Sequence, residues 1–356
     1  MSATKIEQLL SNETIALHEL VKELIVFEDL YSFFRNNSAR RDAVLAHVQR
    51  TVDAYNAGDA DARYTLHRSL SYIYETSLYI PDKKPVYNQN DPILVEIQRE
   101  LEAAWEAFEE ARMPELNDVP EDPKEFERWL RHFVLNHYVA DHPLYEYLEN
   151  DATFEEMREF MSEEITVDTR FDDLVAFAQV GTDGTIKMEL AENYWDEMGN
   201  GKMEEVHTVM FNHLLEELNL TNQDTLLNLM EGASWEALAC GNALLNNVLY
   251  RKNVYKALGS LGALEMMSPK RFDRLVGGYK RLGLSEQAAM YHSLHVAIDT
   301  RHGNGWLRNA VVPFVAADKD IRWEIIKGAF YRLHTSLDYA DRLYKRFTEN
   351  KELVNA

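Results

Sequence analysis

The segment 291–302, YHSLHVAIDTRH, holds three of the twelve histidines in the chain. On a helix with 100° between successive residues, His295, Asp299 and His302 lie within about 60° of one another on one face. Imidazole and carboxylate groups gathered on one face are typical metal ligands. A structural helix whose core-facing histidines hydrogen-bond to an aspartate has the same pattern, so the segment alone leaves both interpretations open.

A second group of donors surrounds a pair of glycines. In the segment 193–207, NYWDEMGNGKMEEVH, Glu197 precedes His207 by ten residues, and Gly199 and Gly201 lie between them. Glycine costs about 1 kcal/mol relative to alanine inside a helix, so the two glycines predict a break. Such a break would let Glu197 and His207 approach one point.

A third segment offers another carboxylate, since Glu163 and Glu164 are adjacent about thirty residues upstream of Glu197. Three carboxylates and three histidines from several helices could hold two iron ions, with carboxylates bridging and imidazoles terminal. The HxxxDxxH pattern by itself would support a single ferrous ion bound by two histidines and a carboxylate. The additional groups favour two ions.

The order of these residues, together with NYWDEMGNG and with HPLYEYLEND from His142, resembles the haem-oxygenase-like diiron oxidases, also described as iron-containing redox enzymes. The resemblance covers roughly residues 128–350. It implies a ligand set of three carboxylates and three histidines, with no catalytic side chain beyond them: Glu164, Glu197, His207, His295, Asp299 and His302. Glu163 is the alternative first ligand. Glu164 is preferred because Asp168 and Phe171 continue its helical face.

The resemblance also implies the chemistry. Two iron ions would be the cofactor and O2 the co-substrate of a non-haem monooxygenase or oxidase, with an external electron donor as a further partner. The expected substrate is a small amine- or amino-acid-derived metabolite, and N-oxygenation is the favoured reaction. Oxidative carbon–carbon cleavage, desaturation or decarboxylation would use the same ligands, and manganese could replace one iron. A non-catalytic helical interaction protein with structural histidines is the alternative from another class.

Other polar residues near these segments have simpler interpretations. Glu192 and Asp196 could support the metal ligands from behind, but we expect them to be solvated. His292 could hydrogen-bond to a ligand or belong to the core. Cys240, the single cysteine, is expected to be buried, and it excludes an internal disulfide and a thiolate-rich zinc site.

The elements that must position these residues are helices. Apolar residues recur at steps of three and four, and 15 glycines and nine prolines are few for 356 residues, so the fold class is all-α. The predicted helices cover 15–34, 41–55, 63–79, 93–112, 125–139, 154–180, 187–197, 203–218, 224–231, 234–250, 253–264, 269–282, 285–302 and 322–347.

A proline-rich, acidic break divides the chain. The segment 113–123, MPELNDVPEDP, has three prolines and four acidic residues. It predicts an N-terminal helical extension over 1–120 and a haem-oxygenase-like catalytic bundle over 121–356. The extension contains no candidate ligand set. The resemblance implies that the extension serves homodimerisation, and packing against the bundle of the same subunit is the alternative.

The net charge excludes several partners. Sixty acidic and 37 basic residues give −23, whereas a nucleic-acid binder needs a basic face. The N-terminal residues do not resemble a signal peptide, and apolar stretches are far shorter than the roughly 20 residues of a membrane helix. The expectation is a cytoplasmic protein that binds neither nucleic acid nor membranes.

Overall fold

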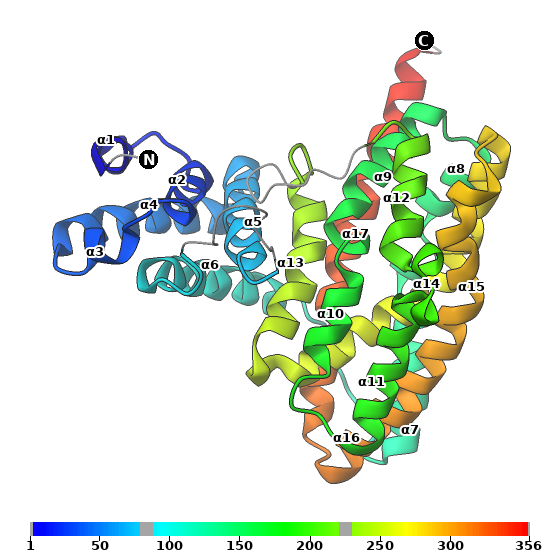
Figure 1. Cartoon of the computed structure of the whole chain (residues 1–356). Helices are drawn as coiled ribbons and strands as arrows, with labels where there is room; N and C mark the ends of the chain where they lie inside the picture. Colours follow the sequence, from blue (N-terminus) through cyan, green and yellow to red (C-terminus); the bar gives the residue numbers. More distant parts are fainter. Residues whose placement is uncertain (1–2, 79–87, 221–229, 355–356) are drawn as a thin grey trace. The chain divides into compact units, whose positions relative to one another are not determined.

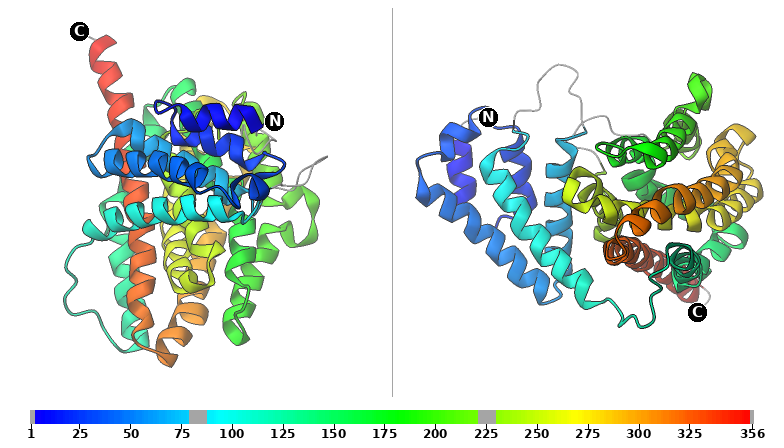
Figure 2. Two further views of the ribbon diagram at one scale, coloured as in Figure 1. Left: turned by 90° about the vertical axis from the view of Figure 1, so that its left-hand side faces the viewer. Right: turned by 90° about the horizontal axis from the view of Figure 1, so that it is seen from below.

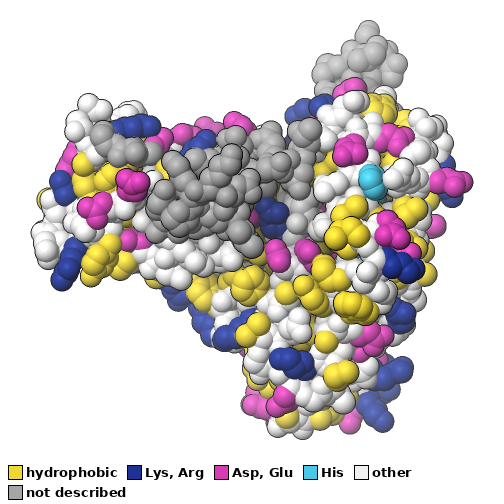
Figure 3. All heavy atoms as spheres, viewed as in Figure 1, with side chains coloured by type: hydrophobic (Ala, Val, Ile, Leu, Met, Phe, Trp, Pro, Cys, Tyr) yellow, Lys and Arg dark blue, Asp and Glu magenta, His cyan; other side chains and the backbone are white. Residues whose placement is uncertain are grey.

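The computed structural model describes residues 3–78, 88–220 and 230–354, and these residues form helices joined by turns, without a strand among them (Figure 1). This confirms the all-α prediction. Within the same ranges no helix combines the length and the apolar character needed to cross a membrane. On the face seen in Figure 3, acidic side chains are interspersed with basic ones and are not collected in one patch.

The chain divides into two compact units. The first comprises Met1–Met113 and Gln223–Asn242, and the second comprises Pro114–Asn222 and Ala243–Ala356. The first unit therefore takes in a later stretch of the chain in addition to the N-terminal helices. Helix α13 (Trp235–Leu249) begins in the first unit and ends in the second.

Short and medium helices build the first unit around a buried aromatic group. His67 lies edge-on to Trp105 and stacks on Trp235, with ring centroids 5.1 and 6.0 Å apart, and Asn242 Nδ2 donates to the His67 carbonyl at 2.8 Å. Besides the start of α13, the helices are α1 (Ala3–Ser11), α2 (Leu17–Ile25), α3 (Leu30–Phe34), α4 (Ser38–Asn56), α5 (Ala60–Glu75) and α6 (Pro92–Ala111).

The single helix predicted over 15–34 is wrong, because α2 ends at Ile25 and α3 begins at Leu30. The side chain of Asn88, distant in sequence, donates to the carbonyls of Leu24, Ile25 and Phe27 at 2.7, 3.0 and 2.8 Å. These bonds satisfy carbonyls that a helix end leaves without partners. A partner more than sixty residues away thus defines the end of α2.

The second unit is built around the long helix α14 (Val254–Leu282), which packs against α8 (Pro143–Asn150), α15 (Glu286–Gly305) and α17 (Ile321–Val354) (Figure 2). The other elements are α7 (Pro123–Leu135), η1 (Tyr138–Asp141), α9 (Phe154–Asp168), α10 (Phe171–Ala178), α11 (Gly184–Glu197), η2 (Gly199–Gly201), η3 (Met203–Glu205), α12 (His207–Glu217), η4 (Arg251–Asn253), η5 (Trp306–Val311) and α16 (Val312–Ala317).

Two glycines bring α14 and α17 into close contact. A Cβ atom on Gly259 would lie 1.9 Å from the Ile325 carbonyl oxygen, and one on Gly328 would lie 1.9 Å from that of Lys256. Only glycine permits this approach of two backbones. Helix α14 also packs against α15, which carries candidate ligands.

Several predicted boundaries differ from the structure. The predicted break before Pro269 is absent, because α14 continues through this proline. Pro269 has no amide hydrogen to donate to the Glu265 carbonyl, so the helix loses one hydrogen bond. Packing of α14 against α15 and α17 outweighs that loss. The helix predicted over 154–180 is two helices, α9 and α10, and the one over 203–218 begins only at His207. The predicted helix 224–231 lies almost wholly outside the described residues.

Candidate metal centre

Helix α15 presents its predicted face to the interior. Ser285 caps the helix by accepting a hydrogen bond from the Ala288 amide at 3.1 Å. His295, Asp299 and His302 are 4%, 3% and 2% exposed. The spacing of these residues therefore does place two imidazoles and a carboxylate on one buried face.

A left-handed turn ends α11 directly after Glu197. Gly199, Asn200 and Gly201 have φ values of 58°, 52° and 86°, and a Cβ atom on Gly199 would lie 2.5 Å from the Glu205 carbonyl carbon. Glycine avoids both the strained backbone and this clash. The turn and η3 return the chain so that α12 begins at His207.

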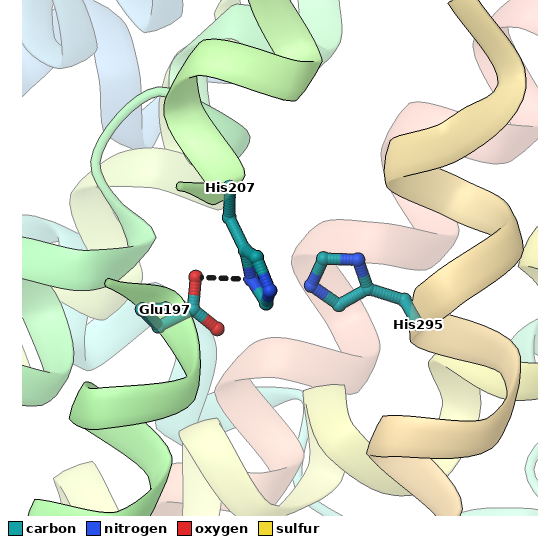
Figure 4. A group of neighbouring side chains, drawn as sticks. All are labelled: Glu197, His207 and His295. Carbon is teal, nitrogen blue, oxygen red and sulfur yellow. Dashed lines mark hydrogen bonds and ion pairs between the residues drawn. The ribbon is translucent and has the colours of Figure 1, made fainter. Parts of the chain in front are cut away.

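The ends of α11 and α12 form a first cluster with α15. Glu197, His207 and His295 offer ligand atoms that lie within 4.8 Å of one another. His207 Nδ1 is 2.7 Å from Glu197 Oε2, and the rings of His207 and His295 are 4.3 Å apart. Figure 4 shows the two imidazoles pointing toward one another from α12 and α15, with the Glu197 carboxylate beside them.

The protonation state of His295 suits a ligand. Its Nδ1 lies 2.7 Å from the Tyr291 carbonyl, which can only accept a hydrogen bond, so Nδ1 carries the proton and Nε2 keeps its lone pair. Burial, and then the neighbouring His207, lower the pKa of His295 to about 4. The imidazole is therefore neutral at pH 7, as metal binding requires.

A second cluster lies further along α15. Glu265, Asp299 and His302 also offer ligand atoms within 4.8 Å of one another, and His302 Nδ1 is 3.8 Å from Glu265 Oε2. Glu265 is 2% exposed, and its Oε2 has no hydrogen-bond partner. Burial and repulsion between neighbouring carboxylates raise the pKa values of Glu265 and Asp299 well above their usual range. A cation bound there would relieve both effects.

Asp196 supports the second cluster from outside. It is 7% exposed, and its Oδ2 lies 2.8 Å from His302 Nε2 and forms an ion pair with Arg301. The expectation that Asp196 is solvated is therefore wrong, because its side chain contacts His302 and Arg301 of α15. Glu192 is exposed, as expected. His292 is fully buried and its Nδ1 lies 3.1 Å from the Tyr279 hydroxyl.

The structure does not bring Glu164 or Glu163 into either cluster. Glu164 Oε2 is 2.6 Å from Arg271 Nη2, and Glu163 pairs with Arg342. One turn later on α9, Asp168 is buried and its Oδ2 has no partner. Burial and the nearby Glu164 raise the pKa of Asp168 to about 8, with a smaller contribution from Glu197. Asp168 is therefore a buried carboxylate of the second unit with one oxygen that makes no hydrogen bond.

Sequence reasoning missed Glu265. The predicted break before Pro269 placed this residue at a helix end, and its segment LGALEMM contains neither histidine nor a second acid. A signal was present nonetheless, because Glu265 is the first acidic residue in α14 and lies among apolar neighbours. A lone carboxylate in an apolar helical stretch is rare unless it is paired or binds a metal.

The family model for iron-containing redox enzymes matches residues 158–337, a range that holds every member of both clusters. The chain belongs to the iron-containing redox enzyme family. This confirms the resemblance, and the helical structure agrees with the haem-oxygenase-like fold that it implied. A search of curated proteins finds no match.

The residues of this family member fit iron. Three carboxylates and three histidines are at most 4% exposed in the two clusters, and burying so many ionisable groups is costly unless a cation pairs with them. Oxygen and imidazole nitrogen donors together suit iron. Family membership and the two clusters support an iron-dependent oxidoreductase.

Proposed function

We propose that the protein is a non-haem diiron oxygenase or oxidase. The observation that carries this proposal is that α15 contributes to both clusters, with His295 in one and Asp299 and His302 in the other. His295 and Asp299 are one helical turn apart, about 6 Å along the axis. Metal ions in two-metal sites are about 3.5–4 Å apart, a spacing that side chains from adjacent turns can serve.

The six clustered residues would hold the ions as two sets. Glu197, His207 and His295 would bind one ion, and the other set is Glu265, Asp299 and His302. Glu164 would join them only after leaving Arg271, so Glu265 takes its place as the third carboxylate in our proposal. Bound ferrous iron would supply the electrons that reduce O2.

The protein's own residues would orient the ligands and exclude water. The Tyr291 carbonyl sets the tautomer of His295, and Asp196 holds His302. Phe272 and the ring of Tyr291 lie 5.7 and 4.3 Å from the His295 ring, measured between centroids. These aromatic side chains make the surroundings of the first cluster apolar, which strengthens electrostatic interactions within it.

The substrate and reaction remain part of the proposal. The family resemblance favours N-oxygenation of a small amine- or amino-acid-derived metabolite, with an external electron donor. Oxidative carbon–carbon cleavage, desaturation or decarboxylation would use the same ligand residues and differ in the shape of the substrate pocket. Manganese in one position would also suit the donors.

Anaerobic Fe(II) titration followed by rapid mixing with O2 tests the proposal. We expect two ions per chain, and a transient visible absorption band that depends on one of a panel of amines and amino acids. His295→Ala should lose the band. His213→Ala is the matched control, because His213 is part-exposed and lies in neither cluster. A chain that binds no iron would support the non-catalytic interaction protein instead.

A further inference from the structure

A small cavity in the second unit lies between η1, α8, α14 and α17, and none of the residues that line it belongs to either cluster. Tyr145, Leu264 and Met267 contribute to its walls together with two arginines, Arg271 and Arg332. The volume of this cavity is about 10 Å³. This is close to the minimum that holds one water molecule or an ion of similar size.

Hydrogen-bond donors in the wall of this cavity lack partners. Arg332 is 5% exposed, and neither its Nε nor its Nη1 has a hydrogen-bond partner. Arg271 Nε and Ser336 Oγ are also buried without a partner. Buried polar groups are nearly always paired, so several unpaired donors around one cavity indicate a missing acceptor.

The charges around the cavity are also unbalanced. Guanidinium groups stay protonated in proteins, so Arg271 and Arg332 contribute two positive charges. Glu164 neutralises one of them through its 2.6 Å contact with Arg271. Asp168 acts electrostatically on both arginines, but its Oδ2 makes no hydrogen bond. A buried charge without a bonded counter-ion is strongly unfavourable, so the cavity is suited to an anion.

We infer that this cavity binds a monovalent anion between Arg271 and Arg332, with Ser336 as an additional donor. Because the cavity holds about one water-sized group, the anion is a free ion of halide size with one negative charge. The apolar walls formed by Leu264 and Met267 disfavour a strongly hydrated divalent anion.

Bromide is a direct probe of the site. Crystals of the iron-free full-length protein soaked in sodium bromide should show an anomalous scattering peak between the Arg271 and Arg332 guanidinium groups. Arg332→Met, which keeps the length of the side chain without its charge, should lose the peak. A wild-type crystal without a peak at this position would overturn the inference.

Thermal unfolding gives an independent measurement in solution. At constant ionic strength set with methanesulfonate, bromide should raise the Tm of the wild-type protein in a concentration-dependent way, because a ligand that binds only the folded state stabilises it. Ser336→Ala should weaken this response, and it serves if Arg332→Met does not fold. Arg308→Met is the matched control, since Arg308 is an exposed arginine of the same unit. Equal responses in all these variants would contradict the site.

A series of carboxylates tests the size limit of the cavity. Acetate and butyrate are larger than one water-sized group, so bromide should raise the Tm more than either of them. A larger Tm shift with butyrate than with bromide would contradict a halide-sized site. These measurements use the iron-free protein, so their outcome is independent of whether the protein binds two irons.

Discussion

At the scale of single residues, burial and hydrogen-bond partners separate the ligand candidates. Five of the six residues that the sequence suggested lie in the two clusters, because helical spacing and the glycine pair are local signals. The sixth could not be predicted. Whether Glu164 joins a cluster of candidate ligands or pairs with an arginine depends on Arg271, more than one hundred residues later. Glu265 was missed for the related reason that its partners come from another helix.

Replacing Glu265 should weaken Fe(II) binding more than replacing Glu164. We expect Glu265→Gln to keep one tight Fe(II) site and to weaken the other by at least about tenfold, since even groups that only support a ligand contribute 10–100-fold. Glu164→Gln should retain two tight sites. Anaerobic Fe(II) titration measures both. The reverse ranking would return Glu164 to the ligand set.

Asp196→Asn tests the support of His302. The amide keeps the shape of the side chain but loses the charge that pairs with Arg301 and lies 2.8 Å from His302 Nε2. Affinity for one Fe(II) should fall by about 10–100-fold while the helix content stays unchanged. Glu192→Gln on the exposed face of the same helix is the control, and an equal loss in that variant would argue against a specific role.

His67 gives the first unit a predictable sensitivity to acid. Burial lowers the pKa of His67 from 6.5 to about 3. Between these two pH values the unfolded state binds a proton at His67 and the folded state does not. Stability therefore falls as the pH falls through this window, by about 2 kcal/mol between pH 7 and pH 5. His67→Phe should remove that part of the loss in urea unfolding. An unchanged pH dependence in His67→Phe would contradict the assignment.

At the scale of elements, local breaks in the chain were easier to predict than continuity. The break after Glu197 follows from two glycines, and the structure shows it as a turn with three residues at positive φ. The continuation of α14 through Pro269 could not be predicted, because it depends on packing against α15 and α17. The end of α2 likewise depends on the distant Asn88.

The turn after Glu197 should tolerate no side chain at its first glycine. Gly199→Ala adds a Cβ atom 2.5 Å from the Glu205 carbonyl carbon at a positive φ, so α11 and α12 must shift relative to one another. We expect a loss of more than about 1 kcal/mol in stability and weaker Fe(II) binding at the Glu197 cluster. Gly181→Ala is a matched control, since Gly181 has φ of 82° but open space around its Cβ position. Equal Fe(II) affinity in the two variants would contradict this role of the turn.

At the scale of the whole molecule, the two units differ in the candidate metal ligands that they contain. Both clusters belong to the second unit, and the family match begins at residue 158. Composition and charge argue against nucleic acid as a partner, which stays a prediction, and they carry no information about assembly. Homodimerisation through the N-terminal unit therefore stays a proposal.

Light scattering coupled to size-exclusion chromatography tests the dimer on the full-length protein. A homodimer has twice the chain mass of 41.3 kDa, and a species of 41.3 kDa at micromolar concentration would contradict the proposal. Truncation near residue 120 is a poor test. It would leave Gln223–Asn242 without the rest of its unit and would expose Trp235.

The composition of the first unit also sets an order of events during translation. Its core needs Trp235 and Asn242, which the ribosome adds 122 and 129 residues after Met113. At about 5–20 residues per second, these two residues are added roughly 6–26 seconds after Met113. His67 and Trp105 stay partly uncovered during this interval, so the first unit cannot complete its core until residue 242 has been added.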